Sequence, residues 1–272
     1  MSGQAPRKGT AAITGASSGI GAVFARRLAK NGYNLLLIAR RVERLEELRQ
    51  ELEATGIQVE VLCADLATDA GLLAVGERIA AVANLELLIN NAGFGIEGPF
   101  FASRLEEHDR MHRLHVLATV HLCHAALQRM EPHGTGTIIN VSSVAGFQAS
   151  AASVSYAATK CWMNNFTEGL WLDLKTRGSR IRIQALCPGF TISEFHDVMA
   201  MDRTKIPSGW WTSADYVVDV SLAALQSGEL FVIPGWRYKA LIWLSRVLPA
   251  AVTRYGTVWF ARNFRNSPGI SK

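Results

Sequence analysis

Three side chains in the middle of the chain have the types and the spacing that proton transfer to a carbonyl oxygen needs. Tyr156 and Lys160 stand four residues apart in YAATK, and Ser143 precedes Tyr156 by thirteen residues. Residues four apart share one face of a helix, so the ammonium of Lys160 favours the phenolate of Tyr156 and makes this phenol a usable acid or base. Ser143 can then hydrogen-bond the substrate oxygen while Tyr156 moves the proton.

Each of these residues has an ordinary alternative explanation when it is taken alone. Ser143 can be a loop residue, Tyr156 can pack in the core with its hydroxyl at the edge, and Lys160 can lie on a solvated helix face. The set points to redox chemistry only if the chain also binds a hydride carrier, so a nucleotide site must be sought in the preceding sequence.

A Gly-rich turn near the N-terminus has the pattern of a dinucleotide site. The segment TGASSGIG follows a β-prone run and opens a helical pattern. In such a turn one glycine bends the chain sharply, a second leaves room for the pyrophosphate, and a third lets the helix pack closely on the strand. The free N–H groups and the positive end of the helix dipole then face the phosphates. The expected cofactor contacts in this turn are Gly15, Ser17, Ser18, Gly19, Ile20 and Gly21.

The end of the next apolar run distinguishes between the two nicotinamide cofactors. A carboxylate there would bind the ribose 2′-hydroxyl and repel a 2′-phosphate, whereas this chain has Ala39, Arg40 and Arg41. Arg40 can make charge-assisted bonds to a phosphate, so the sequence predicts NADP(H) as the cofactor. The alternative is that Arg40 and Arg41 only end the strand with solvated charge.

Two further segments follow apolar runs and complete the expected cofactor site. Asp65 and Leu66, in CADL, are expected to accept a hydrogen bond from the adenine amino group and to cover the ring. Asn91, Ala92 and Gly93, in NNAG, are expected to pin a neighbouring loop and to let the cofactor lie close to the backbone. Both segments then lie at the carboxyl ends of parallel strands, where ligands bind in open α/β sheets.

Apolar runs alternate with helical patterns along most of the chain, which predicts a single α/β domain over residues 1–272. The expected fold class is a doubly wound, mostly parallel, Rossmann-like sheet with helices on both faces. Strands are expected at 10–14, 34–39, 59–63, 87–90, 137–141, 180–186 and 229–233. Helices are expected at 20–30, 41–54, 71–83, 106–130 and 155–175.

Composition narrows the class of protein further. The formal net charge is +5, but the basic residues are scattered and no nucleic-acid-binding motif accompanies them, so no nucleic-acid partner is expected. The four cysteines have neither CxxC pairing nor metal-ligand spacing, which predicts reduced thiols and no metal site. A short polar N-terminus, and the absence of an apolar run of about 18 residues, predict a cytoplasmic protein.

Together these motifs resemble the classical short-chain dehydrogenase/reductase family over roughly residues 8–235. TGASSGIG, NNAG, Ser143, YAATK and CPGF occur in the family's order and spacing. The resemblance implies that Tyr156 is the acid/base, Lys160 its activator and Ser143 the residue that orients the carbonyl. It also implies that the cofactor contacts Tyr156, Lys160 and a loop that contains Pro188, Gly189, Thr191 and Ser193. Family relatives are usually homodimers or homotetramers, and the same is expected here.

One position departs from the family pattern. The family usually has an Asn whose backbone carbonyl holds a relay water near the lysine, and RMHRLHVLATV places His115 there. A backbone carbonyl survives any substitution, and an imidazole can itself transfer protons near neutral pH. His115 is therefore a fourth candidate catalytic residue, in a working but altered relay. The alternative is a histidine that only packs within its helix.

The irregular sequence after Gly189 predicts a substrate lid over residues 190–212. The apolar residues of this lid are Phe190, Phe195, Val198, Met199, Met201, Trp210 and Trp211. Phe94, Ile96 and Phe147 are expected to complete the pocket walls. Such an apolar pocket with few polar groups suits a lipophilic ketone or secondary alcohol. The alternative is that these side chains only pack the lid onto the body.

Residues 236–272 form a basic, apolar extension that is expected to fold as two helices separated at Pro249. Such helices can lie on an anionic membrane, cover a subunit interface or cover the substrate pocket. Packing on protein is favoured here, and peripheral membrane contact is the alternative.

The function that accounts for all these residues is reversible hydride transfer between NADP(H) and a lipophilic ketone or secondary alcohol. One rival is an NADP(H)-binding regulatory or scaffold protein with lapsed catalysis, against which the intact Ser143, Tyr156 and Lys160 argue. A second rival is an epimerase or dehydratase that uses the nicotinamide transiently, which net cofactor turnover would separate from a dehydrogenase.

Overall fold

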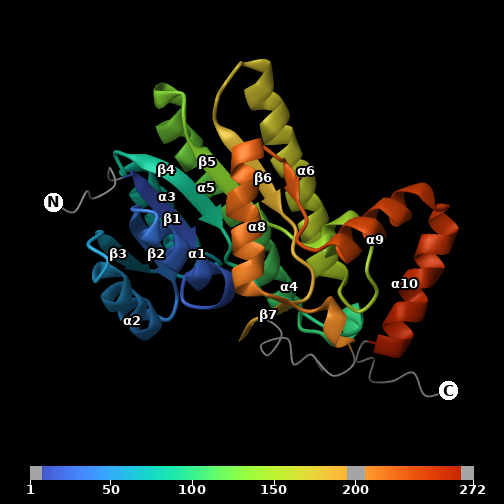
Figure 1. Cartoon of the computed structure of the whole chain (residues 1–272). Coiled ribbons are helices and arrows are strands. Elements are labelled where there is room, and N and C mark those ends of the chain that lie inside the picture. Colours follow the sequence, from blue (N-terminus) through green and yellow to red (C-terminus); the bar gives the residue numbers. More distant parts are fainter. Residues whose placement is uncertain (1–7, 195–205, 265–272) are drawn as a thin grey trace.

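The chain is built around one seven-stranded sheet, in a computed structural model that describes residues 8–194 and 206–264 (Figure 1). The strand order is β3-β2-β1-β4-β5-β6-β9, and every neighbouring pair is parallel. The strands are β1 Thr10–Thr14, β2 Asn34–Ala39, β3 Val59–Cys63, β4 Leu85–Asn90, β5 Thr137–Val141, β6 Arg182–Leu186 and β9 Phe231–Val232. The expected doubly wound α/β class is therefore confirmed.

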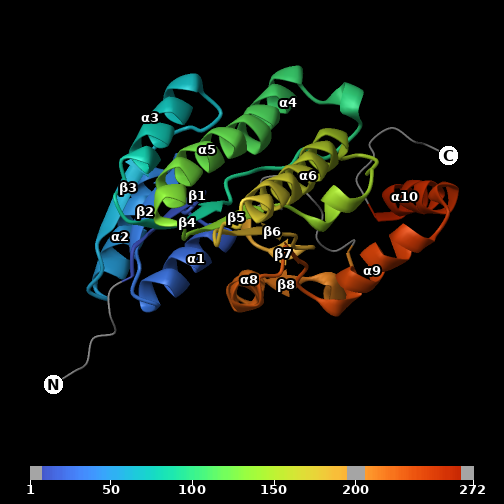
Figure 2. The ribbon, with the colours of Figure 1, turned by 90° about the horizontal axis from the view of Figure 1, so that it is seen from above.

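Helices cover both faces of the sheet (Figure 2). Helices α1, α2 and α8 pack on one face, and α3, α5 and α6 pack on the other. Because β1 and β2 are covered on both sides, their sequences are continuous apolar runs instead of alternating ones. The helices are α1 Gly19–Lys30, α2 Val42–Glu53, α3 Asp69–Ala80, α4 Leu105–His112, α5 Ala118–Met130, α6 Val154–Thr176, α8 Ala214–Ser227, α9 Trp236–Val247 and α10 Ala250–Phe264.

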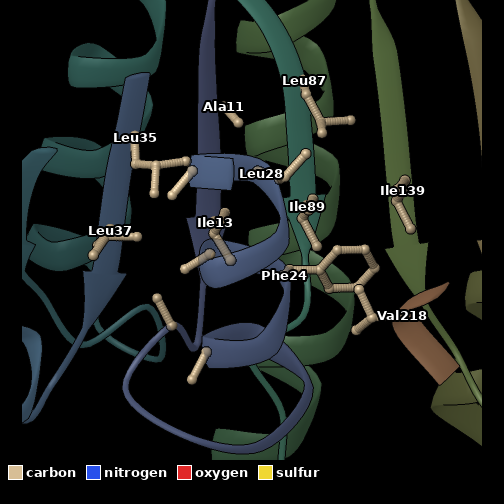
Figure 3. Packing of buried hydrophobic residues seen from close by; sticks show 14 of the residues in the cluster. Ala11, Ile13, Phe24, Leu28, Leu35, Leu37, Leu87, Ile89, Ile139 and Val218 are labelled. Carbon is tan, nitrogen blue, oxygen red and sulfur yellow. The ribbon is translucent and has the colours of Figure 1, made fainter. Parts of the chain in front are cut away.

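The first helix is anchored to the sheet by its buried apolar face (Figure 3). Phe24 and Leu28 of α1 belong to one core cluster with Ile13 of β1, Ile89 of β4 and Val218 of α8. These contacts set the position of α1 over the two central strands. They therefore also set the position of the Gly-rich turn that joins β1 to α1.

The single helix expected at 106–130 is interrupted. Between α4 and α5 lies one π-helical turn, Arg113–Leu117, in which the Ala118 N–H donates to the carbonyl of Arg113, five residues back. Such turns hold one residue more than an α-helical turn and often occur at functional sites. His115 lies in this turn and is completely buried, and apolar periodicity alone gives no sign of the turn.

Helix α3 begins two residues before the expected start at Gly71. The hydroxyl of Thr68 accepts a hydrogen bond from the Gly71 N–H and caps the helix, so Asp69 is already its first residue.

The ends of the expected lid are joined by a second, two-stranded sheet. Strand β7, Thr191–Ile192, pairs in parallel with β8, Thr212–Ser213. The lid residues Phe195, Val198, Met199 and Met201 lie outside the described residues. Beyond this sheet, α9 ends and α10 begins on either side of Pro249. Among the described helices, none is long and apolar enough to cross a membrane.

We expect Phe24→Ala to lower the free energy of unfolding by about 3–5 kcal/mol, because it leaves a cavity between α1 and the sheet. Urea unfolding followed by circular dichroism measures this loss. The matched control is Leu73→Ala on the solvent side of α3, expected to change stability by less than about 0.5 kcal/mol. Equal losses in the two variants would contradict the assignment of Phe24 to the core.

Candidate active site

The carboxyl ends of the central strands open into one cavity of about 890 Å³. The strand order reverses between β1 and β4, and such a switch point leaves a crevice where ligands bind. The expected site residues that line this cavity are Gly15, Ser17, Ser18, Gly19, Ile20, Arg40, Asp65, Leu66, Asn91, Ala92, Gly93, Ser143, Tyr156, Lys160, Pro188, Gly189, Thr191 and Ser193. Gly21 and His115, the two other expected residues, lie outside the lining.

The Gly-rich turn packs tightly against the residues that follow β4. Gly15 has a φ of +66°, and a Cβ there would lie 2.8 Å from the amide nitrogen of Asn91. This amide donates to the carbonyl oxygen of Thr14 at 2.9 Å and so pins the turn. A Cβ on Gly21 would lie 2.3 Å from the Gly15 oxygen. Gly21 therefore faces the turn itself and does not line the cavity. Gly21 serves the packing of α1 on the turn.

Two arginines lie beside this turn at the end of β2. Arg40 is exposed and lines the cavity, and it forms no ion pair within residues 8–194 and 206–264. Arg41 donates to the Ser18 hydroxyl at 2.8 Å and pairs with Glu194 at 2.9 Å. The guanidiniums of Arg44 and Arg41 lower the pKa of the Glu194 carboxyl below its usual value. The sequence indicates only Arg40 for phosphate binding, and the structure adds Arg41 at the same place.

Asp65 follows β3 and lines the same cavity as the Gly-rich turn and Arg40. Its carboxylate accepts from Arg110 at 2.8 Å and from the Ala67 N–H at 3.0 Å. Burial by itself raises the pKa of Asp65, but the hydrogen bonds from Arg110 and Ala67 outweigh it, and the pKa lies below its usual value. Asp65 is therefore an ionised acceptor. Arg110, on α4, is a lining residue that no sequence motif signals.

Ser143, Tyr156 and Lys160 meet where β5 ends and α6 begins. The Ser143 hydroxyl accepts from the Ala145 N–H at 3.1 Å and makes a long bond of 3.5 Å to the carbonyl of Pro188. Tyr156 and Lys160 both lie in the first two turns of α6, with the lysine nitrogen 5.7 Å from the centre of the phenol ring. The three side chains therefore line the same cavity with the expected spacing.

Lys160 is buried, and its ammonium donates to the carbonyl oxygen of Val141 at 2.8 Å. Burial lowers the pKa of Lys160 to about 8. The side chain is therefore mostly an ammonium at neutral pH, as the activation of a phenol requires. The Ser142 hydroxyl donates to the Lys160 carbonyl at 3.1 Å and ties this turn of α6 to the end of β5.

His115 is completely buried beside Tyr156. Its Nε2 accepts from the Phe94 N–H at 3.3 Å, so Nδ1 carries the proton and donates to the Thr159 hydroxyl at 2.9 Å. Thr159 in turn donates to the carbonyl of Tyr156, and the imidazole meets the Tyr156 ring edge-on with 5.9 Å between centres. His115 thus links the loop after β4 to the helix that bears Tyr156.

The ionisation of His115 is suppressed in this position. Burial, followed by the positive charge of Lys160, lowers the pKa of His115 well below its usual value, so the imidazole stays neutral. The carbonyl oxygen of His115, where the family pattern places a relay, accepts from the Thr119 hydroxyl at 2.8 Å.

The substrate end of the cavity has walls that the sequence indicates only in part. Phe94, Phe147, Phe190 and Trp210 line it as expected. Ile96 and Trp211 do not line it, since Trp211 packs its ring on Phe190 with 5.5 Å between centres instead. The opposite wall consists of apolar residues of α9 and α10, namely Leu241, Ile242, Leu244, Leu248, Val252, Trp259 and Phe260. From the sequence, the extension can lie on a membrane, cover a subunit interface or cover the pocket, and the structure shows that it lines the cavity.

Tyr238 fastens α9 to the segments that contain Phe190 and Trp210. Its hydroxyl accepts from the Phe190 N–H at 2.9 Å and donates to the carbonyl of Trp210. Burial raises the pKa of Tyr238 to about 12, so the phenol stays neutral. A Cβ on Gly189 would overlap the Tyr238 ring, so the loop beside the cavity and α9 fit closely.

A doubly wound sheet with a Gly-rich turn at its switch point, and a Ser–Tyr–Lys set in the same cavity, define a nucleotide-binding oxidoreductase fold. The family model described as short chain dehydrogenase matches residues 9–203. The chain therefore belongs to the short chain dehydrogenase family.

Similar proteins cover nearly the whole chain. A Myxococcus xanthus protein described as an uncharacterized oxidoreductase is 31% identical over 243 residues, which are 88% of this chain and 92% of the relative. A short-chain dehydrogenase from Sphingobium yanoikuyae, solved in complex with NADPH, has 35% identity and a TM-score of 0.79, covering 95% of this chain and 98% of that one. The bulky-bulky ketone specific alcohol dehydrogenase from Comamonas testosteroni has 30% identity and a TM-score of 0.74, covering 97% and 96%.

We expect His115 to make the folded state sensitive to acid. Below about pH 6.5 the unfolded chain protonates this histidine while the folded chain does not. Stability is therefore lost as the pH falls, by up to about 1.4 kcal/mol per pH unit for this one group. His115→Asn removes that contribution, which urea unfolding at several pH values between 7.5 and 5.0 would measure.

The control for this measurement is His121→Asn, on the exposed side of α5, which should keep the wild-type slope. An unchanged slope in His115→Asn would show that the buried imidazole is not held neutral.

Proposed function

We propose that the protein is an NADP(H)-dependent oxidoreductase that interconverts lipophilic ketones and secondary alcohols. The observation that carries this proposal is the continuity of the cavity. The Gly-rich turn lies at one end, Ser143, Tyr156 and Lys160 lie in the middle, and the apolar side of α9 and α10 lies at the other end. The similarity to a relative solved with NADPH and to one specific for bulky ketones supports the same proposal.

The residues around the turn fit a dinucleotide phosphate. The Gly15 to Ile20 backbone and the Ser17 and Ser18 hydroxyls would face the pyrophosphate, and Arg40 would meet the 2′-phosphate with Arg41 beside it. The remaining contacts would come from Asp65 and Leu66 to the adenine, and from Asn91, Ala92, Gly93, Pro188, Gly189, Thr191 and Ser193 along the ribose and nicotinamide. When bound, the nicotinamide supplies or accepts a hydride at the substrate carbon.

The proton moves through Tyr156. In the reducing direction its hydroxyl gives a proton to the carbonyl oxygen, and the nearby Lys160 ammonium stabilises the resulting phenolate. The Ser143 hydroxyl has one lone pair tied to the Ala145 N–H and only a long bond to Pro188, so its proton can turn toward the substrate oxygen. In the oxidising direction Tyr156 accepts the proton instead.

His115 acts in this proposal as a positioning residue. Both of its nitrogens are engaged, with Phe94 and Thr159, and its ring stays neutral. It therefore supports the Tyr156 helix through Thr159 and does not itself exchange protons. We expect His115→Asn to lower kcat without moving the pH profile of kcat. A shifted profile would assign the imidazole to the proton relay.

The two rival functions have no specific observation in their favour. A scaffold with lapsed catalysis would not need Ser143, Tyr156 and Lys160 around one cavity, and an epimerase or dehydratase would give no net cofactor turnover.

A homodimer or homotetramer remains the expected assembly for a protein of this family, and analytical ultracentrifugation would measure it.

We expect calorimetric titration to show tighter binding of NADPH than of NADH. Arg40→Ala should weaken NADPH binding about 10- to 100-fold, because one charge-assisted contact to a phosphate is lost, and should leave NADH binding unchanged. Arg26→Ala is the matched control, since Arg26 pairs with Glu51 outside the cavity. Preference for NADH in the wild type would overturn the cofactor assignment.

We expect the wild type to oxidise NADPH with a bulky lipophilic ketone, and Tyr156→Phe to lower kcat/KM by about 100- to 10,000-fold. Binding of NADPH to this variant should persist. Tyr216→Phe, an exposed tyrosine on α8, is the control and should keep full activity. Full activity in Tyr156→Phe would refute its role, and NADPH binding without turnover of any ketone would favour the scaffold.

A further inference from the structure

The outer face of the C-terminal helices carries exposed aromatic and aliphatic side chains, here named the outer stripe. On α9, Trp236 and Trp243 are 74% and 66% exposed, and with Val247 they have the spacing i, i+7, i+11 of a single helix face. On α10, Tyr255 is 76% exposed, and Val258 lies one turn further along. Side chains of this size and exposure on two consecutive helices indicate a contact surface.

Neither the fold nor the cavity accounts for the outer stripe. The buried residues of the two helices are Tyr238, Ile242 and Ala261, which face the body. Tyr238 and Ile242 also line the cavity, together with residues such as Leu248 and Phe260, and the outer stripe contributes none of the lining residues. In both views α9 and α10 form the end of the molecule opposite to α2 and β3 (Figures 1 and 2).

The charge around the outer stripe is mostly positive, although Glu229 pairs with Lys239 at 3.8 Å. From residue 230 to residue 272 the sequence contains no Asp or Glu, and its basic residues are Arg237, Lys239, Arg246, Arg254, Arg262, Arg265 and Lys272. On α9, Lys239 and Arg246 lie seven residues apart and both are exposed, and the Arg246 guanidinium lies 5.6 Å from the centre of the Phe147 ring. On α10, Arg262 lies seven residues after Tyr255 and shares its face. Electrostatic complementarity therefore favours an anionic occupant.

A second copy of the chain does not offer this complementarity. A two-fold interface brings the same patch of both subunits together, so it would place basic residues against basic residues. Interleaved tryptophans, tyrosine and arginines on helices suit instead the headgroup region of a bilayer. There the rings lie at the interface and the cations reach the lipid phosphates.

We propose that the outer stripe docks the protein on an anionic phospholipid surface. The cavity-lining residues of the same helices, Leu244 and Leu248 among them, then lie close to the bilayer. A lipophilic substrate dissolved in the membrane would reach the pocket along this wall. This route of the substrate into the pocket rests on the proposed function, whereas the docking on the membrane does not.

Flotation of the full-length protein with vesicles tests the docking. We expect the protein to float with vesicles of phosphatidylcholine mixed with phosphatidylglycerol, and to stay behind with phosphatidylcholine alone. High salt should release it, because screening weakens contacts to surface charge. The double variant Arg254→Gln, Arg262→Gln should lose about 30-fold in partition, at about a factor of five for each charge. Trp243→Ser with Tyr255→Ser should lose binding as well.

The matched control combines Leu73→Ser, at a residue 63% exposed on α3, with Arg177→Gln near the end of α6, and should float like the wild type. Failure to bind the mixed vesicles, or equal binding of all variants, would overturn the proposal. If Trp243→Ser with Tyr255→Ser instead changed the oligomeric state in light scattering, the face would be a subunit interface. NADPH binding and ketone reduction in the same variants separate a failure of docking from a failure of the proposed function.

Discussion

The amide of Asn91 donates hydrogen bonds to the carbonyl oxygens of Thr14 and Gly15, and this contact joins the ends of β1 and β4. The Thr14 hydroxyl completes the junction by accepting from the N–H groups of Asn91 and Ala92. Only glycine at positions 15 and 21 lets the turn come so close. The crevice at the switch point, and with it both halves of the cavity, depends on this junction.

The catalytic end is built from polar groups that burial would penalise if they had no partners. Lys160 donates to the carbonyl oxygen of Val141, and the imidazole of His115 is bonded at both nitrogens. The same burial lowers the pKa of Lys160 to about 8 and keeps His115 neutral. One charged side chain and one neutral one thus lie 5.7 Å and 5.9 Å from the Tyr156 ring centre, and the positive charge belongs to Lys160.

The C-terminal helices have two different sides. Their inner side closes the cavity with apolar residues, and Tyr238 fixes them to the loop after β6. Their outer side is apolar and basic. One pair of helices therefore shapes the pocket and, in our proposal, also sets the surface from which the substrate arrives. This combination links substrate preference and location to the same 29 residues, 236–264.

The sequence by itself determined the fold class, the strands from β1 to β5 within about two residues, and the set Ser143, Tyr156 and Lys160. These features are encoded in local order, because apolar runs, glycines and helical spacing act between near neighbours. The tertiary structure alone decided the π-helical turn at Arg113–Leu117, the pairing of Arg110 with Asp65, and the use of α9 and α10 as a pocket wall. The last two of these features join segments far apart in the chain, and only the packing of helices on the sheet brings these segments together.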